Sequence, residues 1–237
     1  MRSSLCVPLF VAAVVVVGCG EGRKPEEGGP VGTPVAGDPK KIVAEIERLG
    51  GSVEVDAKQT SKPVVKVNLG ESRATDATLA KLPGLPKLQK LVLRGTSISD
   101  AGLAHLQGLP QLTRLSLSAT PVGDAGLAHL KPLSRLVELD LGSTRVSDAG
   151  LAHLKGLTQL QELYLADTKI TDAGLVHLRG LTQLTRLDMS GTAVGDAGIE
   201  HLKGLTRLHM VFLAKTKISD EGAGGLQKAL PKAKIVQ

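Results

Sequence analysis

The chain is poor in aromatic residues and in cysteine. Its 237 residues include no Trp, one Tyr, two Phe and two Cys. Protein cores normally take much of their buried area from aromatic rings, so this core must be built from Leu, Ile, Val and Ala. Binding of single-stranded nucleic acid by base stacking needs a row of aromatic side chains, which three rings do not supply. The 42% hydrophobic content excludes a wholly disordered chain.

Residues 1–18 have the features of a secretory signal. Arg2 supplies a positive charge, and Leu5–Val17 is almost wholly apolar but shorter than the roughly 20 residues that span a bilayer. The segment Val16–Cys19 (VVGC) resembles a bacterial lipobox, which implies that Cys19 is lipidated and becomes the new N-terminus. A plain signal peptide or a weak membrane anchor is the alternative. Cys6 would leave with the signal, so no thiol would remain for a disulfide or a metal site.

Residues 19–38 are predicted to form a flexible tether behind the lipidated cysteine. Residues 20–38 contain six Gly and three Pro and show no apolar periodicity. Gly20 is not Asp, and the sorting rule implied by the lipobox resemblance then favours the outer membrane. We therefore expect a lipid-anchored, extracytoplasmic protein of the cell envelope, attached to its membrane through Cys19.

The rest of the chain repeats with a period of 24 residues. Each unit opens on one of the leucines Leu88, Leu112, Leu136, Leu160, Leu184 and Leu208, and a degenerate earlier unit starts at Val64. The first full unit reads LxxLxLxxTxIxDxGLxHLxxL from Leu88 to Leu109. This phrase resembles the leucine-rich repeat family over roughly residues 64–237. Its Asp-Ala-Gly-Leu part is similar to the bacterial repeat class and to the repeats of eukaryotic F-box proteins.

The pattern predicts an α/β leucine-rich repeat solenoid, with a curved parallel sheet on the concave side and short helices on the convex side. Leu91 and Leu93 alternate as in a strand that is buried on one face, and Asp100–Leu109 fits a short helix that either Ser99 or Asp100 could cap. The recurring Thr is expected to satisfy backbone groups in the turn between strand and helix. Strands stack about 4.8 Å apart and helices need about 10 Å, so the sheet should be concave. Residues 39–63 are predicted as an N-terminal cap, and 64–237 as the repeats with a C-terminal cap.

Three repeated columns of polar residues, namely the recurring Thr, His and Asp, are interpreted as structural. His105, His129, His153, His177 and His201 project in parallel from successive helices, so they do not converge on a metal ion. Each is expected to pack beside a small residue of the next unit. Regular Asp residues likewise lack the unique constellation of a catalytic site, and no catalytic motif stands apart from the repeat. We expect neither an enzyme nor a cofactor, metal or small-molecule substrate.

A fourth column is basic and ends successive helices. It consists of Lys131, Lys155, Arg179 and Lys203. Attraction to an anionic lipid or polymer is one interpretation, and favourable placement at the negative ends of the helices is the other. The formal net charge of +6 is modest, and nucleic acid is not expected as a partner.

The outward-facing positions of the strands do not repeat, as a binding surface would require. They combine an acidic middle with apolar anchors of the kind enriched in binding hot spots. The residues predicted to bind a partner are Glu138, Asp140, Glu162, Tyr164, Asp167, Arg186, Asp188, Met210 and Phe212. We therefore predict a non-enzymatic protein-binding module displayed on a membrane, with an unidentified protein partner on the concave face. The alternatives are an envelope scaffold without a specific ligand, and a substrate receptor similar to those of F-box ubiquitin ligases.

Overall fold

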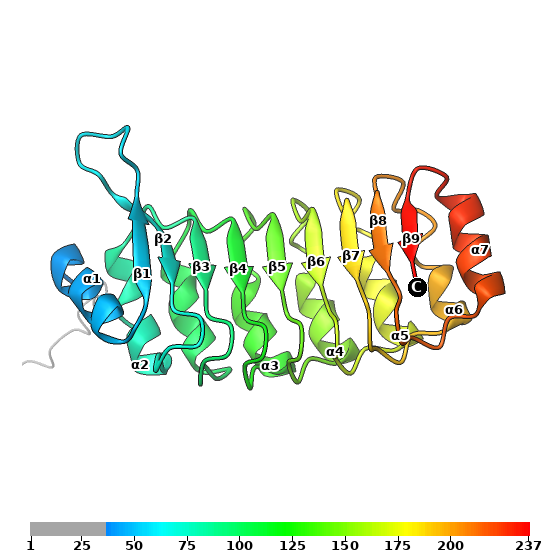
Figure 1. Cartoon of the computed structure of the whole chain (residues 1–237), viewed down its shortest axis with the longest axis horizontal. Coiled ribbons are helices and arrows are strands. Elements are labelled where there is room, and N and C mark those ends of the chain that lie inside the picture. The colour runs from blue at the N-terminus through cyan, green and yellow to red at the C-terminus, as the bar shows by residue number, and fades with distance from the viewer. Residues whose placement is uncertain (1–36) are drawn as a thin grey trace, which may run out of the picture. The chain divides into compact units, whose positions relative to one another are not determined.

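The computed structural model describes residues 37–237, which form one sheet lined on one side by short helices (Figure 1). The nine strands lie in chain order: β1 (Ser52–Val55), β2 (Val64–Asn68), β3 (Lys90–Val92), β4 (Arg114–Ser116), β5 (Glu138–Asp140), β6 (Glu162–Tyr164), β7 (Arg186–Asp188), β8 (Met210–Phe212) and β9 (Lys234–Val236). The predicted signal (1–18), Cys19 and nearly all of the predicted tether lie outside the described residues.

The return segments between strands β2 and β8 contain single α-helical turns and 3₁₀ helices, whereas the segment between β8 and β9 contains the ten-residue helix α7. The α-helices are α1 (Pro39–Arg48), α2 (Asp76–Leu79), α3 (Asp124–Leu127), α4 (Asp148–Leu151), α5 (Asp172–Leu175), α6 (Asp196–Ile199) and α7 (Asp220–Ala229). The 3₁₀ helices are η1 (Leu82–Gly84), η2 (Gly102–Gly108), η3 (Ala128–Leu130), η4 (Ala152–Leu154) and η5 (Val176–Leu178). A 3₁₀ turn is narrower and rises further per residue than an α-turn, which suits units that must repeat at the spacing of strands.

The parallel sheet predicted for the repeats is confirmed for β2 to β9, whereas β1 belongs to the segment predicted as the N-terminal cap. In the parallel part, each residue pairs with the residue 24 positions later, as Leu139 does with Leu163. Strand β1 instead pairs antiparallel with β2. The reason is the connection, because residues 56–63 form a short hairpin loop, whereas a parallel pair needs a crossover of a dozen residues or more.

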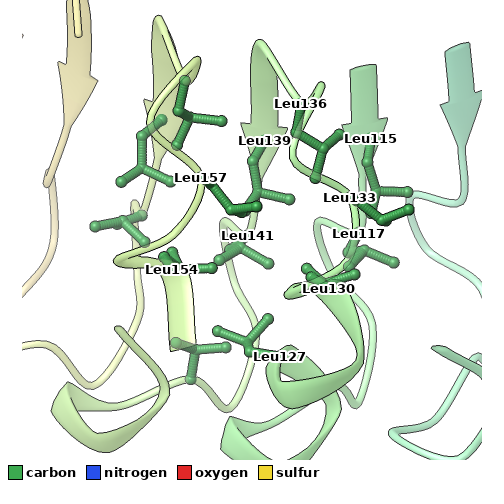
Figure 2. Packing of buried hydrophobic residues seen from close by; sticks show 14 of the residues in the cluster. Leu115, Leu117, Leu127, Leu130, Leu133, Leu136, Leu139, Leu141, Leu154 and Leu157 are labelled. Carbon is green, nitrogen blue, oxygen red and sulfur yellow. The ribbon is translucent and has the colours of Figure 1, made fainter. Parts of the chain in front are cut away.

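The core is a stack of aliphatic layers between the sheet and the helices. One layer runs through the inward residues of strands β3 to β8, which are Leu91, Leu115, Leu139, Leu163, Leu187 and Val211. Each of these side chains is at most 1% exposed. Figure 2 shows leucines of neighbouring units in contact range, with Leu157 beside Leu139 and Leu133 beside Leu115. No aromatic ring belongs to the buried core of residues 37–237, as the composition predicts.

The recurring Thr closes the turn that follows each strand. In six consecutive units its Oγ1 donates a hydrogen bond of 2.6–2.7 Å to the carbonyl oxygen three residues earlier. In the first five of these units the Thr is buried, so the hydroxyl satisfies a carbonyl that water cannot reach. The predicted role of the Thr column is thereby confirmed.

The recurring Asp does not cap its own helix but joins its unit to the next one. Asp148 Oδ1 accepts a hydrogen bond of 2.8 Å from the Thr171 backbone N–H, and its Oδ2 accepts one of 2.6 Å from the Thr171 hydroxyl. The same carboxylate lies against the recurring Gly of the next unit, because a Cβ on Gly174 would be 2.3 Å from Asp148 Oδ1. The Asp and the Gly of neighbouring units therefore interlock, and a methyl group has no room between them.

The residue that caps the convex helix differs from one unit to another. In α5 and α7 the residue before the Asp is the cap, since Thr171 Oγ1 accepts from the Ala173 N–H and Ser219 Oγ from the Gly222 N–H. In the first full unit neither Ser99 nor Asp100 caps, because η2 begins only at Gly102. In α3 and α6 the residue before the Asp is Gly123 or Gly195, which has no side chain to act as a cap.

Candidate interaction surface

The outward side chains of strands β3 to β8 form the sheet face, which carries all the predicted partner-binding residues except Asp167 in the turn after β6. The strand register aligns them in two columns. The first contains Lys90, Arg114, Glu138, Glu162, Arg186 and Met210, and the second contains Val92, Ser116, Asp140, Tyr164, Asp188 and Phe212. Buried layers repeat beneath these columns, so the chemical variety of each unit is concentrated on this face.

Tyr164 is held between a carboxylate and a guanidinium. Its hydroxyl donates to Glu162 Oε2 on the same strand, and Arg186 Nη1 donates to the same hydroxyl over 3.3 Å from the neighbouring strand. Burial raises the pKa of the Tyr164 phenol, the hydrogen bond to Glu162 raises it further, and Arg186 pulls the pKa partly back. At neutral pH the phenol therefore stays protonated and keeps donating to Glu162.

Large apolar side chains continue from Tyr164 towards β8. Arg186 Nη2 lies 3.4 Å from Met210 Sδ, so one guanidinium bridges Tyr164 and Met210. Phe212 is aligned with Asp188 on the neighbouring strand. Tyr164, Arg186, Met210 and Phe212, here called the aromatic patch, are all half-buried. Tyr, Phe, Met and Arg are the residue types most enriched at protein–protein interfaces.

The predicted acidic residues also serve the structure. Asp140 Oδ1 accepts from the Gly142 N–H at 3.0 Å, and Asp188 Oδ1 accepts from the Ser190 N–H at 2.9 Å. Asp140 Oδ2 further accepts from the Ser116 hydroxyl at 2.8 Å. These carboxylates thus order the turns that follow their own strands, and both residues are half-buried. The sequence pattern did not reveal this second role, because the side-chain direction depends on the turn.

A shallow hollow of about 410 Å³ brings part of the predicted set together. Of the nine predicted residues, Glu138, Asp140, Tyr164, Asp167 and Asp188 line it, whereas Glu162, Arg186, Met210 and Phe212 do not. Three further polar residues line it that were not predicted, namely Arg94, Ser118 and Ser143. Ser143 and Asp167 share the turn position with positive φ, at 55° and 54°, and this turn column is the signal that could have identified Ser143.

The charge of this region is partly offset within the chain. Arg114 Nε lies 3.4 Å from Glu138 Oε2, with side chains 55% and 28% exposed. An ion pair this exposed contributes little to stability, but it lowers the negative potential beside the hollow. The acidic middle is therefore weaker in charge than a count of its carboxylates indicates.

Two members of the histidine column contact polar side chains of the preceding unit. Gln107 Nε2 lies 3.3 Å from His129 Nδ1, and Arg179 Nη2 lies 2.6 Å from His201 Nδ1. Long side chains at the helix ends thus reach the next unit, a contact that the sequence analysis did not predict. The expected packing of each His beside a small residue of the next unit stays a prediction. Burial, followed by the nearby Lys155, lowers the pKa of His177. Within residues 37–237 no cluster of His, Cys, Asp or Glu is arranged to hold a metal ion.

Comparison with known proteins agrees with the geometry. The family model described as "Leucine rich repeat" matches residues 134–194. The fold is a leucine-rich repeat solenoid. The crystal structure of internalin C2 from Listeria monocytogenes is similar to it, with 26% identity, a TM-score of 0.64, and coverage of 82% of this chain and 81% of that one. No curated protein matches the sequence.

A second internalin carries the same repeat architecture in a longer chain. Internalin F of Listeria monocytogenes is 24% identical with a TM-score of 0.56, and the match covers 73% of this chain. This chain spans about half of that protein, since 53% of internalin F is covered. At this identity the likeness establishes the fold alone. Across residues 37–237, the helices are all too short or too polar to cross a lipid bilayer.

Proposed function

We propose that the protein is a non-enzymatic protein-binding module that engages a protein partner on its sheet face. The observation that carries this proposal is the aromatic patch, where Tyr164, Arg186, Met210 and Phe212 gather on neighbouring strands. The chain has only one Tyr and two Phe, and two of these three rings lie on the face whose composition does not repeat. The leucine-rich repeat fold and its likeness to internalin C2 support a role in protein binding.

The patch has the physical properties of a binding hot spot. Its rings and thioether are half-buried, so a partner that covers them removes apolar area from water at a small cost in side-chain entropy. The Arg186 guanidinium is already held by Tyr164 and Met210, which reduces the ordering needed on binding. The neighbouring hollow supplies carboxylates that can select a complementary partner.

The test is cross-linking with mass spectrometry in the native envelope, followed by affinity measurement with the partner that is identified. We expect Tyr164→Ala with Phe212→Ala to weaken binding by about 2–4 kcal/mol. The matched control is Gln107→Ala with Val176→Ala, which removes exposed side chains from the helix side. Equal capture of the partner by both double variants would overturn the sheet-face proposal, and absence of any cross-linked partner would favour the scaffold alternative.

We also propose that the module is displayed on the extracytoplasmic side of a membrane through lipidated Cys19. The support is the sequence of residues 1–38, with its charged start, apolar run, lipobox-like Val16–Cys19 and Gly/Pro-rich continuation. Several acyl chains on one cysteine would anchor the protein stably, which a single chain does not. Mass spectrometry of the envelope-bound protein tests this step, because its expected N-terminus is an acylated Cys19. A chain that still begins at Met1, or an unmodified Cys19, would overturn it.

A further inference from the structure

The two long edges of the solenoid carry opposite charge. The amino edge is defined as the segments that lead into strands β3 to β9, and the carboxyl edge as the turns and first helical residues that follow strands β2 to β8. The amino-edge segments are 80–89, 104–113, 128–137, 152–161, 176–185, 200–209 and 224–233. They contain ten Lys and Arg and one carboxylate, Glu200, which is a net charge of +9.

The carboxyl edge differs because it contains the interlocking Asp column. Its segments are 70–79, 94–103, 118–127, 142–151, 166–175, 190–199 and 214–223, and they hold ten carboxylates and six Lys and Arg, a net charge of −4. Strands β2 to β9 are parallel and in register, so the two sets of segments lie along opposite edges of the sheet (Figure 1). A modest overall charge therefore conceals a strongly basic edge.

The basic edge is exposed and mostly uncompensated. Lys131, Lys155 and Arg179 occupy the same position in three consecutive units, are exposed, and take part in none of the ion pairs found among residues 37–237. Two other lysines of this edge do form ion pairs, Lys81 with Glu45 and Lys203 with Glu200. The consecutive units place Lys131, Lys155 and Arg179 in a row, with Arg179 in contact with the His201 ring.

Helix electrostatics accounts for only part of this edge. Lys131, Lys155 and Arg179 directly follow the 3₁₀ turns η3, η4 and η5, and a cation is favourable at such an end. A second set stands further along the chain, close to the strand starts, and includes Lys87, Arg135 and Arg207. Arg135 and Arg207 donate hydrogen bonds to Gln111 and Gln183 of the preceding unit. Strands offer no comparable negative end, so helix electrostatics does not explain why these positions are also basic.

We propose that the amino edge is a docking surface for an anionic lipid bilayer. A row of exposed cations along one edge suits a flat and extended partner, because every unit can reach it at once. Lys and Arg within a Debye length of anionic headgroups each strengthen such binding, and the attraction falls with salt. Docking along this edge leaves the sheet face open to a protein partner. The inference stands apart from the sheet-face function, since none of the cations named for it lies on that face.

The test measures binding of the full chain to vesicles, with Cys19→Ser in every variant so that no lipid is attached. Vesicles of phosphatidylcholine alone are compared with vesicles containing an equal amount of phosphatidylglycerol. We expect the mixed vesicles to bind at least about tenfold more tightly, and K131E/K155E/R179E to lose about 100-fold in affinity for them. The ratio between the vesicle types reports the attraction of charge, and the loss in the triple variant assigns that attraction to the amino edge.

The matched control places the same charge change on the other edge. R145E/K169E/K217E reverses three exposed cations of the carboxyl-edge turns. Its affinity for the mixed vesicles should stay within about twofold of that of the protein without these three substitutions. Equal losses in the two triple variants, or equal binding to both vesicle types, would overturn the proposal. So would tighter binding of soluble polyphosphate than of mixed vesicles, which would assign the edge to a polyanion.

If circular dichroism shows misfolding of the Glu variant, K131Q/K155Q/R179Q replaces it. Unchanged binding of the mixed vesicles by that variant also overturns the proposal.

Discussion

At the residue scale, the repeat depends on a side chain that reaches across to the next unit. The carboxylate of each recurring Asp accepts hydrogen bonds from the turn of the following unit and lies against that unit's Gly. Six successive glycines have a place for Cβ only 2.1–2.6 Å from such an oxygen, namely Gly102, Gly126, Gly150, Gly174, Gly198 and Gly222. Sequence periodicity identified both columns, but not that they act as one contact.

Gly150→Ala should therefore destabilise the fold. Its Cβ would lie 2.4 Å from Asp124 Oδ1, so the carboxylate must move away from the Ser147 groups that donate to it. We expect a loss of about 1–3 kcal/mol in the free energy of unfolding, measured with urea. Gly156→Ala is the control because nothing lies within 4 Å of its Cβ position. Equal stability of the two variants would contradict the interlock.

Tyr164 supplies a spectroscopic test of its own surroundings, because it is the only Tyr in the chain. The absorbance of the phenolate should appear above the ordinary pKa of about 10, since burial and Glu162 raise the pKa. Glu162→Gln should lower the midpoint by removing a negative neighbour. Arg186→Gln should raise it, because the guanidinium favours the phenolate. Shifts of the same sign in both variants would contradict the described contacts.

At the element scale, each short helix is stable only through its neighbours. Helices α2 to α6 have four residues each, far fewer than an isolated helix needs in water. Their stability comes from leucines that pack between sheet and helices, and from the Asp contacts that join consecutive turns. At the C-terminal end, Asp196 binds the Ser219 N–H and hydroxyl and so joins the last short helix, α6, to the longer α7.

The stability of this junction should depend on pH. The hydrogen bonds from the Ser219 hydroxyl and backbone lower the pKa of Asp196. The carboxylate therefore stabilises the fold above its unfolded-state pKa, and this contribution is lost as the pH falls towards the lower folded-state pKa. Asp196→Asn should reduce the acid dependence of urea unfolding, whereas Glu221→Gln, at an exposed site on α7, should preserve it. Identical pH profiles for Asp196→Asn and the unmodified protein would contradict this account.

At the scale of the whole molecule, the described part is a linear array in which each unit contacts mainly its neighbours. The register between β2 and β9 advances by 24 residues at every step. The array separates its functions in space, with the leucine layers inside, the variable residues on the sheet face and the charges divided between the two edges. Only the positions outside the repeat consensus are free to encode a partner.

Removal of one complete unit should leave the solenoid folded. Deletion of residues 136–159 joins Arg135 directly to Leu160. Leu160 then takes the place of its equivalent Leu136, three residues after Leu133. We expect strand and helix signals in circular dichroism to remain and unfolding to stay cooperative. Deletion of only 12 residues, 136–147, would bring polar positions into the core and should prevent folding. A folded product from the second deletion would contradict the strict register.

Much of the architecture followed from local sequence pattern. Alternation at Leu91 and Leu93, the short helical segment and the 24-residue period identify strands, return segments and their order, because each depends on residues close in the chain. The non-repeating columns likewise identified the sheet face. The antiparallel β1 and the absence of a cap at Ser99 were not predictable in this way, since both depend on how the chain turns in space.

The sequence by itself determined the repeat, the aliphatic core and the set of residues on the variable face. The tertiary structure decided what those residues contact. It directs Asp148 towards Thr171, engages Asp140 and Asp188 in their own turns, and joins Arg186 to both Tyr164 and Met210. Most of these contacts join residues 22 to 24 positions apart, and the reason they escape sequence reasoning is physical. Periodicity aligns the backbones, but the direction and reach of each side chain are set only when neighbouring units pack.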